Sequence, residues 1–188
     1  MLIIGITGTL GAGKGTVVDY LAQHFGLTHF SVRAFLADDL RQRGIEVNRD
    51  TLTEWANKLR VAHSPSYIIE QLYEKAAIEN RNCIIESIRT PGEIAALRKK
   101  EHFYLLAVDA SPEIRYDRIR LRKSETDNVS YETFLSNEKR EMHSNDPTKQ
   151  NLAECIRQAD YVILNNGDLD ALHQATNAFL HSIGLINH

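Results

Sequence analysis

A glycine-rich segment near the start of the chain has the composition and spacing of a loop that binds phosphate groups. Such a loop needs consecutive backbone N–H groups that turn inward around a polyphosphate, and side chains at those positions would obstruct them. The residues that we expect to form it are Gly8, Gly11, Ala12, Gly13, Lys14, Gly15 and Thr16. Lys14 would reach the β- and γ-phosphates of ATP, and the hydroxyl of Thr16 would serve a bound Mg²⁺ ion.

The loop is flanked by a strand and a helix in the order that a phosphate site requires. The apolar residues 2–6 predict a buried strand before it, and an amphipathic run that includes Val17 and Leu21 predicts a helix after it. The N-terminus of that helix would add a partial positive charge. Gly15 stands where the strict G-x4-G-K-[ST] pattern has Ser or Thr. A glycine-rich turn without a nucleotide is the alternative, which the flanking elements disfavour.

Five short apolar runs are typical of buried strands. Most are continuous rather than alternating, as expected for parallel strands covered on both faces. They occupy residues 2–6, 27–31, 82–87, 103–109 and 161–165. Stretches with a helical period separate them, so strands and helices alternate along the chain. We therefore predict an α/β fold with three layers, a five-stranded parallel sheet and helices on both of its faces.

Capping patterns predict where several helices begin. Thr51 with Glu54 and Thr90 with Glu93 have the spacing of capping boxes, and Pro91 occupies the first helical position of the second. A capping residue followed by proline also occurs at Ser64-Pro65, Ser111-Pro112 and Asp146-Pro147.

The composition fits one globular domain. The 188 residues are 43% hydrophobic and 25% charged, with a formal net charge of −3, which excludes whole-chain disorder and a general surface for nucleic acid or membranes. We expect no specific nucleic-acid binding, no signal peptide and no membrane span. Cys83 and Cys155 are too few for a disulfide framework or a zinc site, which favours the cytoplasm. The oligomeric state stays open.

Three segments, spread along the chain, resemble nucleoside monophosphate kinases. Lysine followed by Gly-Thr at 14–16 looks like the adenylate-kinase form of the loop. Residues 84–93 resemble the strand-to-helix segment in which these kinases hold the acceptor's phosphate with an arginine, and residues 118–122 are similar to the arginine pair that opens their lid. The late segment 159–165, Ala-Asp-Tyr-Val-Ile-Leu-Asn, also resembles adenylate kinase-related and dephospho-CoA kinase-like P-loop kinases.

The resemblance implies a P-loop NTPase fold in a single kinase domain, residues 1–188. An acceptor-binding excursion would occupy about residues 33–80. The most polar stretch, about residues 122–151, carries few large apolar side chains and is expected to form a small mobile lid. Closure of this lid would exclude water from the site and suppress wasteful ATP hydrolysis.

Two acidic residues end predicted strands and could serve phosphoryl transfer. Glu86 ends the third strand, where it could hold Mg²⁺ through water or accept a proton from the acceptor. The alternative is a solvated carboxylate at a strand end. Asp109 ranks second, because the Ser111-Pro112 that follows it favours helix capping.

Three arginines are candidates for binding the acceptor. Arg89 lies between the third strand and a capped helix, at the edge of the sheet where α/β proteins bind ligands, and could bind a phosphate through two hydrogen bonds. Arg33 follows the second strand and would face the same cleft, although the related families place their arginine where this chain has Ala37. Arg60 ends a predicted helix. A surface salt bridge for Arg89 and a solvated side chain for Arg60 are the alternatives.

Arginines in and near the polar stretch are candidates for stabilising the transferred charge. Arg118 and Arg122 share a predicted helix face with Arg115, pointing toward the polar stretch. Arg140 would come from the far side of the lid and meet the γ-phosphate on closure. The alternative for Arg140 is an exposed helix with alternating charges.

Together these residues predict an ATP-dependent phosphotransferase that acts on a small nucleotide acceptor, most simply a (deoxy)nucleoside monophosphate, with Mg²⁺ as the cofactor besides ATP. Dephospho-CoA kinase is the alternative within enzymes, although the second strand lacks the Asp-x-Asp pattern associated with its bacterial form. A different class is an ATP-binding switch or assembly ATPase without a small acceptor. The arginine after the third strand and the arginine-rich lid favour the kinase.

Overall fold

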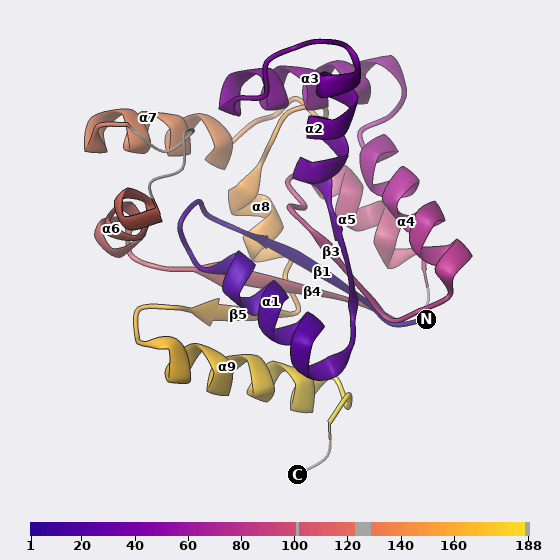
Figure 1. Cartoon of the computed structure of the whole chain (residues 1–188), viewed down its shortest axis with the longest axis vertical. Helices are drawn as coiled ribbons and strands as arrows, with labels where there is room; N and C mark the ends of the chain where they lie inside the picture. Colours follow the sequence, from indigo (N-terminus) through magenta and orange to yellow (C-terminus); the bar gives the residue numbers. More distant parts are fainter. Residues whose placement is uncertain (101, 123–128, 187–188) are drawn as a thin grey trace.

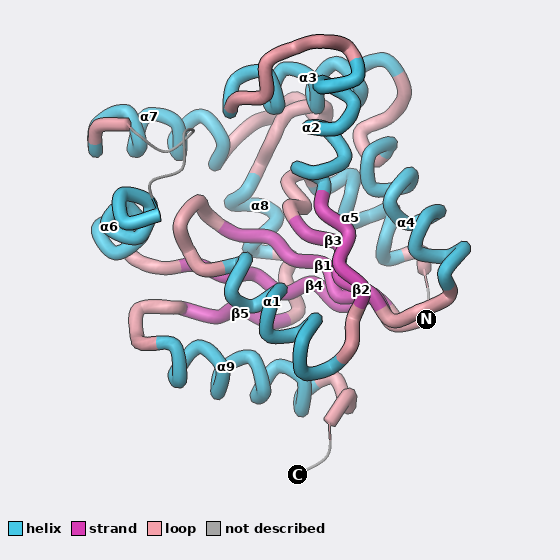
Figure 2. The backbone as a smooth tube through the Cα atoms, in the orientation of Figure 1, coloured by secondary structure: helices cyan, strands magenta, loops and turns pink. Residues whose placement is uncertain are grey.

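The computed structural model describes residues 1–100, 102–122 and 129–186. A five-stranded parallel sheet lies between layers of helices (Figures 1 and 2). The strands are β1 (Ile3–Gly8), β2 (Thr28–Ser31), β3 (Cys83–Glu86), β4 (Phe103–Asp109) and β5 (Tyr161–Leu164). Their spatial order is β2-β3-β1-β4-β5, with every neighbouring pair parallel. The predicted strands and the predicted three-layer α/β fold are thus confirmed.

Helices cover both faces of this sheet. The helices are α1 (Lys14–Phe25), α2 (Val32–Gln42), α3 (Arg49–Ala62), α4 (Tyr67–Glu79), α5 (Pro91–Arg98), α6 (Pro112–Arg122), α7 (Tyr131–Met142), α8 (Leu152–Arg157) and α9 (Leu169–Ser182). Helices α1 and α9 pack on one face, and α4, α5 and α8 pack on the other. Figure 1 shows α2 and α3 above the end of the sheet, and α6 and α7 at its side.

Burial on both sides explains the continuous apolar run of the central strand. Ile3 belongs to the core on the side of α4 and α5, whereas Ile4 and Ile6 belong to the core beneath α1 and α9. Each of these three side chains is at most 1% exposed. Because all strands are parallel, the carboxyl ends of β1, β3 and β4 meet at one edge of the sheet, which places Gly8, Glu86 and Asp109 at that edge.

Two predicted helix starts are confirmed. Thr90 caps α5 with Pro91 at its first position, and the side chains of Thr90 and Glu93 form both hydrogen bonds of a capping box. Helix α6 begins at Pro112, directly after Ser111.

The prediction that Thr51 caps a helix is wrong. Helix α3 begins at Arg49, and its capping residue is Asn48, whose side chain accepts a hydrogen bond from the backbone N–H of Thr51 at 2.9 Å. Asn48 has the extended backbone that a capping position needs, so Thr51 becomes the reciprocal member of an earlier box. The Thr51 and Glu54 spacing is therefore coincidental.

Two cap-then-proline patterns also fail to start helices. Helix α4 begins at Tyr67, two residues later than Pro65. Asp146 instead accepts hydrogen bonds from the backbone N–H and the hydroxyl of Thr148, at 2.9 and 2.7 Å, which closes a turn. The next helix, α8, starts after Asn151, whose side chain caps it.

Part of the predicted lid is helical and anchored. Residues 123–128 lie outside the described residues. Helix α7, within the predicted lid, packs against α6 and α8, and Phe134 is its buried anchor, with its ring against Tyr116 and Tyr131. The mobility of this lid stays a prediction.

Gly8 and Gly15 give a matched test of the geometry at the start of the loop. Gly8 has φ +129°, and a Cβ there would lie 1.9 Å from the carbonyl oxygen of Val108 in β4. Gly8→Ala should therefore lower the free energy of unfolding by more than about 2 kcal/mol. Gly15 lies in the first turn of α1 with nothing within 4 Å of its Cβ position, so Gly15→Ala should raise it by about 0.5 kcal/mol.

Urea denaturation of the two variants beside the natural protein provides the measurement. Equal transition midpoints for the two variants would show that Gly8 does not lie so close to the Val108 carbonyl oxygen at the end of β1.

Candidate functional site

The loop between β1 and α1 is shaped by glycines that have no room for side chains. Gly11 and Gly13 have φ values of +79° and +101°. A Cβ on Gly11 would lie 2.5 Å from the carbonyl oxygen of Arg115, and a Cβ on Gly13 would lie 2.5 Å from Nδ2 of Asn165. No side chain caps the N-terminus of α1, so its first N–H groups can bind an anion.

Two side chains from neighbouring strand ends fasten this loop. The hydroxyl of Thr9 donates a short hydrogen bond to Oδ1 of Asp109, at the end of β4. Nδ2 of Asn165, directly after β5, donates to the carbonyl of Ala12 at 2.8 Å and is buried. Asp109 therefore holds the loop, a role that the expectation of helix capping did not include.

Lys14 lies folded over the loop. Its Nζ donates to the carbonyl oxygens of Gly8 at 3.0 Å and Thr9 at 2.6 Å. Burial of the ammonium group and the charge of Arg89 together lower the pKa of Lys14 to about 7, against the opposing effect of Glu86. A bound polyphosphate would supply negative charge beside the ammonium group and so stabilise the charged form of Lys14.

Glu86 presents an ionised carboxylate beside the loop. It ends β3, is paired in register with Ile6 of β1, and its side chain is 18% exposed. Burial raises the pKa of this carboxyl, but the hydrogen bond from His29, at 3.1 Å, and the charge of Lys14 outweigh burial and hold the pKa below its ordinary value. Sequence reasoning missed His29, which lies on the adjacent strand β2.

The oxygen atoms near the loop fit Mg²⁺ held partly through water. Thr16 lies exposed in the first turn of α1 and offers a hydroxyl, and Glu86 offers a carboxylate. Mg²⁺ prefers such oxygen ligands and keeps several waters. Among the residues that the structure describes, no three His, Cys, Asp or Glu side chains gather as a metal cluster.

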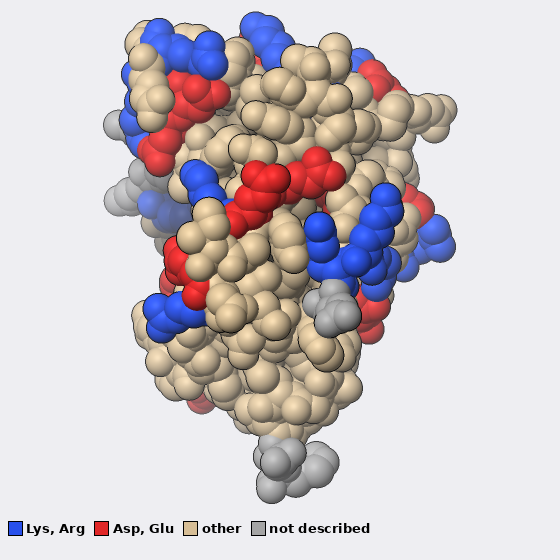
Figure 3. Space-filling view, turned by 90° about the vertical axis from the view of Figure 1, so that its right-hand side faces the viewer, with Lys and Arg blue, Asp and Glu red and all other residues tan. Residues whose placement is uncertain are grey.

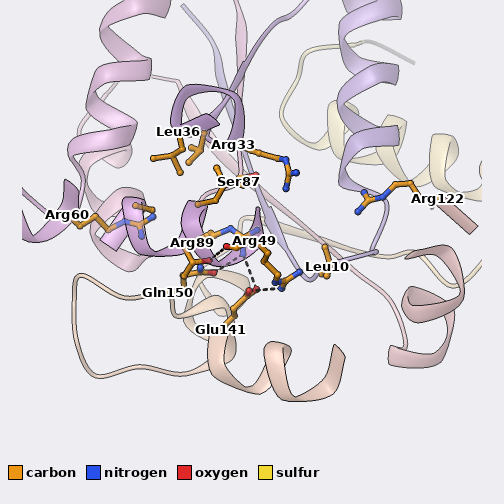
Figure 4. A pocket seen from close by; sticks show the side chains of 14 residues that line it. Leu10, Arg33, Leu36, Arg49, Arg60, Ser87, Arg89, Arg122, Glu141 and Gln150 are labelled. Atoms are coloured by element: carbon orange, nitrogen blue, oxygen red, sulfur yellow. Dashed lines mark hydrogen bonds and ion pairs between the residues drawn. The ribbon is translucent and has the colours of Figure 1, made fainter. Parts of the chain in front are cut away.

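A pocket rich in arginine lies next to the loop (Figure 4). Its apolar wall comes from α2 and α3. The residues that line the pocket are Leu10, Val32, Arg33, Leu36, Arg49, Leu52, Thr53, Ala56, Arg60, Ser87, Arg89, Arg122, Glu141 and Gln150. The structure thus brings together the predicted acceptor residues Arg33, Arg60 and Arg89 with the predicted lid residue Arg122.

Arg89 is held by three elements. Its Nη1 donates to Oε2 of Glu141 in α7 at 3.1 Å and to Oε1 of Gln150 at 2.8 Å. Its backbone N–H donates to Oε2 of Glu93 in α5 at 2.7 Å. The side chain is 26% exposed, so the guanidinium is fixed in place while part of it stays accessible.

Arg60 is buried, which corrects the alternative of a solvated side chain. Its side chain is 1% exposed, and its Nη2 lies 2.9 Å from Oε1 of Glu93, which is fully buried. The same Glu93 carboxylate caps α5. Arg60 therefore joins α3 to α5, and its charge is already compensated by Glu93.

Sequence reasoning missed Arg49 and Glu141. Nη2 of Arg49 lies 2.6 Å from Oε1 of Glu141, which is 6% exposed, and Nε of Arg49 is buried without a hydrogen-bond partner. Glu141 follows Arg140 in a run that resembles an exposed charged helix, and Arg49 stands before the misplaced helix start at Thr51. No local signal in the sequence distinguishes Arg49 and Glu141 from ordinary charged residues at the surface.

The arginines of α6 contact different parts of the molecule, which corrects the expectation that they all point toward the polar stretch. Arg118 donates to the carbonyl oxygens of Asn165 at 2.9 Å and Gly167 at 3.3 Å, beside β5. Arg115, buried, turns to α7 instead, where it binds both oxygens of Glu138.

Arg122 lines the pocket, and Figure 4 shows it on the opposite side from Arg60. Arg140 is 57% exposed, with its Nη2 3.6 Å from Oδ1 of Asp50 in α3. Its side chain thus lies at the surface, as expected from the alternative of an exposed helix with alternating charges.

The outer surface carries both signs of charge. On the face shown in Figure 3, basic and acidic side chains form separate small groups among other residues. Within the described part of the chain, no helix has the length and apolar character needed to cross a membrane.

Known proteins resemble this chain over almost its whole length. The family model AAA_18, an AAA domain, matches residues 4–144. A UPF0200 protein of Methanococcus vannielii is 28% identical, with 97% of each chain covered. A UPF0200 protein of Methanocaldococcus jannaschii is 30% identical, with 94% of this chain and 88% of the relative covered.

Solved structures share the fold. TT1252 from Thermus thermophilus has a TM-score of 0.64 at 23% identity, with 96% of this chain and 97% of that chain covered. A shikimate kinase from Bacteroides thetaiotaomicron has a TM-score of 0.62 at 12% identity, covering 97% and 98%. A gluconokinase from Sinorhizobium meliloti has a TM-score of 0.58 at 16% identity, covering 97% and 93%. The predicted P-loop kinase-like fold is confirmed by these structures, and the chain belongs both to the AAA_18 family of AAA domains and to the UPF0200 proteins.

Proposed function

We propose that this protein transfers the γ-phosphoryl group of ATP to a small nucleotide acceptor, most simply a (deoxy)nucleoside monophosphate. One observation carries the proposal: an arginine-lined pocket opens beside the lysine of a phosphate loop. Leu10 belongs to both the loop and the pocket wall, and the charges of Arg89 and Glu141 act on Lys14. Donor and acceptor phosphates bound at these two places would be neighbours.

The residues present suit phosphoryl transfer, which needs positioning and positive charge more than a protein nucleophile. The loop amides and Lys14 would hold the donor, and Thr16 and Glu86 would hold Mg²⁺, Glu86 through water. The ion would supply charge neutralisation between the phosphates. Arg89 with Arg33 would orient the acceptor's phosphate.

The remaining predicted residues have supporting parts in this proposal. Arg122 would reach the transferred group from the far wall of the pocket. Arg118 and Arg140 would contribute after a rearrangement of their present contacts with Asn165 and Asp50. Arg60 would fix the floor of the pocket through Glu93.

The apolar wall of the pocket supports a nucleotide over a purely polar acceptor. Leu36, Leu52 and Ala56 line it and are themselves at most 7% exposed. A planar base could pack against such a wall while its phosphate reaches the arginines, because ligand sites combine apolar surface with a few placed polar groups.

Alanine substitution tests the two central residues. Lys14→Ala or Arg89→Ala should lower turnover by two to three orders of magnitude, about 3–4 kcal/mol of transition-state stabilisation. ADP release with a panel of nucleoside monophosphates is the measurement, with circular dichroism to verify folding. Arg157→Ala, which removes a 71% exposed arginine on α8, is the matched control and should keep full activity. Unchanged turnover in folded Arg89→Ala protein would refute its role at the acceptor.

The panel also separates the rival functions. Dephospho-CoA belongs in it, and ADP release stimulated by dephospho-CoA alone would favour that kinase. An ATPase rate that no small acceptor stimulates, together with a stable protein partner, would favour a switch or assembly ATPase.

The pKa of Lys14 predicts a pH dependence for nucleotide binding. In the free protein the pKa is about 7, and a bound polyphosphate favours the charged lysine and raises it. At pH 8.5 the free lysine is mostly neutral, so ADP binding should take up close to one proton, and affinity should fall by up to tenfold per pH unit above about 7. The phosphate groups themselves are ionised there, since their last pKa is about 6.

Calorimetric titration with ADP in two buffers of different ionisation enthalpy measures this uptake. Lys14→Arg is the control, because a guanidinium stays charged and should bind without proton uptake. Equal proton uptake by the natural protein and the arginine variant would contradict the assignment to Lys14.

A further inference from the structure

The side chain of Glu141 lies where an acceptor's anionic group would bind. Its Oε1 is 2.6 Å from Nη2 of Arg49 and its Oε2 is 3.1 Å from Nη1 of Arg89. Figure 4 shows this carboxylate between the two guanidinium groups. Of the described residues that line the pocket, it alone carries a carboxylate, and five carry guanidinium groups. The protein's own carboxylate thus lies between two of the guanidinium groups that line the pocket.

Two further observations indicate that Glu141 alone does not complete the polar contacts of this part of the pocket. Nε of Arg49 is buried and has no hydrogen-bond partner, a state that is unfavourable for a polar group. Ser87, in the same pocket, has φ +71°, an uncommon conformation for a residue other than glycine that clusters at ligand sites. A carboxylate has two oxygens, and each already faces one arginine, whereas a phosphate has a third for the Nε of Arg49.

We propose that Glu141 is a specificity-determining residue, an internal carboxylate that the acceptor must displace from Arg49 and Arg89, so that the pocket selects dianionic phosphomonoesters over monocarboxylates. The inference rests on the proposed function, because it concerns the acceptor pocket of that reaction. It adds the reason why a carboxylate acceptor, bearing the same group as Glu141, is rejected.

The selection follows from competition between like groups. A free monocarboxylate offers the arginines the same charge and geometry as Glu141, which is already tethered beside them at high effective concentration. A monocarboxylate that displaces Glu141 therefore gains no binding free energy from the exchange. A phosphomonoester brings nearly twice the charge and a third oxygen, so it alone gains enough to displace the tethered carboxylate.

Glu132 supplies a control on the same helix, because it lies exposed in the first turn of α7. It is absent from the pocket lining. Glu132→Gln therefore removes the same charge from α7 without releasing Arg49 or Arg89. Any effect specific to the acceptor pocket must appear with Glu141→Gln and not with Glu132→Gln.

The experiment is a titration followed by the ¹⁵N signals of arginine Nε–H groups, with Arg49→Lys to identify the Arg49 signal. Orthophosphate and acetate at pH 8 are the probes. In the natural protein, phosphate should shift and saturate the Arg49 and Arg89 signals, and acetate at the same concentrations should not. Affinity is read from the Arg49 signal, because Arg89, unlike Arg49, is among the charges that act on Lys14 and its signal can also respond to phosphate bound at the glycine loop.

Glu141→Gln should bind phosphate at least tenfold more tightly and should also bind acetate, so the preference for phosphate narrows. Glu132→Gln should bind both anions within twofold of the natural protein. Glu141→Asp, too short to span both arginines, should give an intermediate gain and replaces the glutamine variant if that one does not fold.

Phosphate affinity unchanged in both Glu141 variants, or acetate binding to the natural protein as tightly as phosphate, would overturn the inference. Its failure is distinguishable from that of the proposed function. If no acceptor supports kinase activity but the anion titrations give the expected results, only the proposed function is refuted. If an acceptor stimulates ADP release but the Glu141 variants bind anions like the natural protein, only the inference about Glu141 is refuted.

Discussion

Repulsion between positive charges at the carboxyl edge of the sheet is the constraint on which the rest of the site depends. A phosphate loop with its lysine and several arginines occupy a small volume, and burial together with the charge of Arg89 lowers the pKa of Lys14. Carboxylates from separate elements offset the repulsion. The pairs are Lys14 with Glu86 nearby, Arg49 and Arg89 with Glu141, Arg60 with Glu93, and Arg115 with Glu138. Each pair also joins two elements, so charge balance and tertiary structure are set by the same contacts.

These pairs differ in how firmly they bind. The Arg60–Glu93 pair is fully buried and shares its carboxylate with a helix cap, so breaking it would leave a charge without a partner in the core. The Arg89–Glu141 contact is partly exposed and borders the pocket. The first kind maintains the shape of the site, and the second kind can be exchanged for a ligand.

The fold could be predicted because its signals are local. Continuous apolar runs mark the five strands, and the glycine spacing around Lys14 marks the loop. The cap of α3 was misplaced because Asn48 and Thr51 carry equally good patterns and only the packing of the helix decides between them. Arg49 and Glu141 are 92 positions apart, and Arg60 and Glu93 are 33 apart. Pairing at such separations depends on how α3, α5 and α7 pack, which composition and spacing do not encode. Sequence reasoning therefore found Arg33, Arg60 and Arg89 as cations but could not say which of them already had a partner.

The two side chains that fasten the glycine loop come from β4 and β5, on the opposite side of β1 from the pocket. Thr9 is bound by Asp109 and Ala12 by Asn165, so the loop backbone is preorganised near both of its ends. A nucleotide that enters it loses little affinity to loop ordering. Because these ties do not involve the arginines that line the pocket, the proposed donor would meet an ordered loop whether or not the proposed acceptor is already bound.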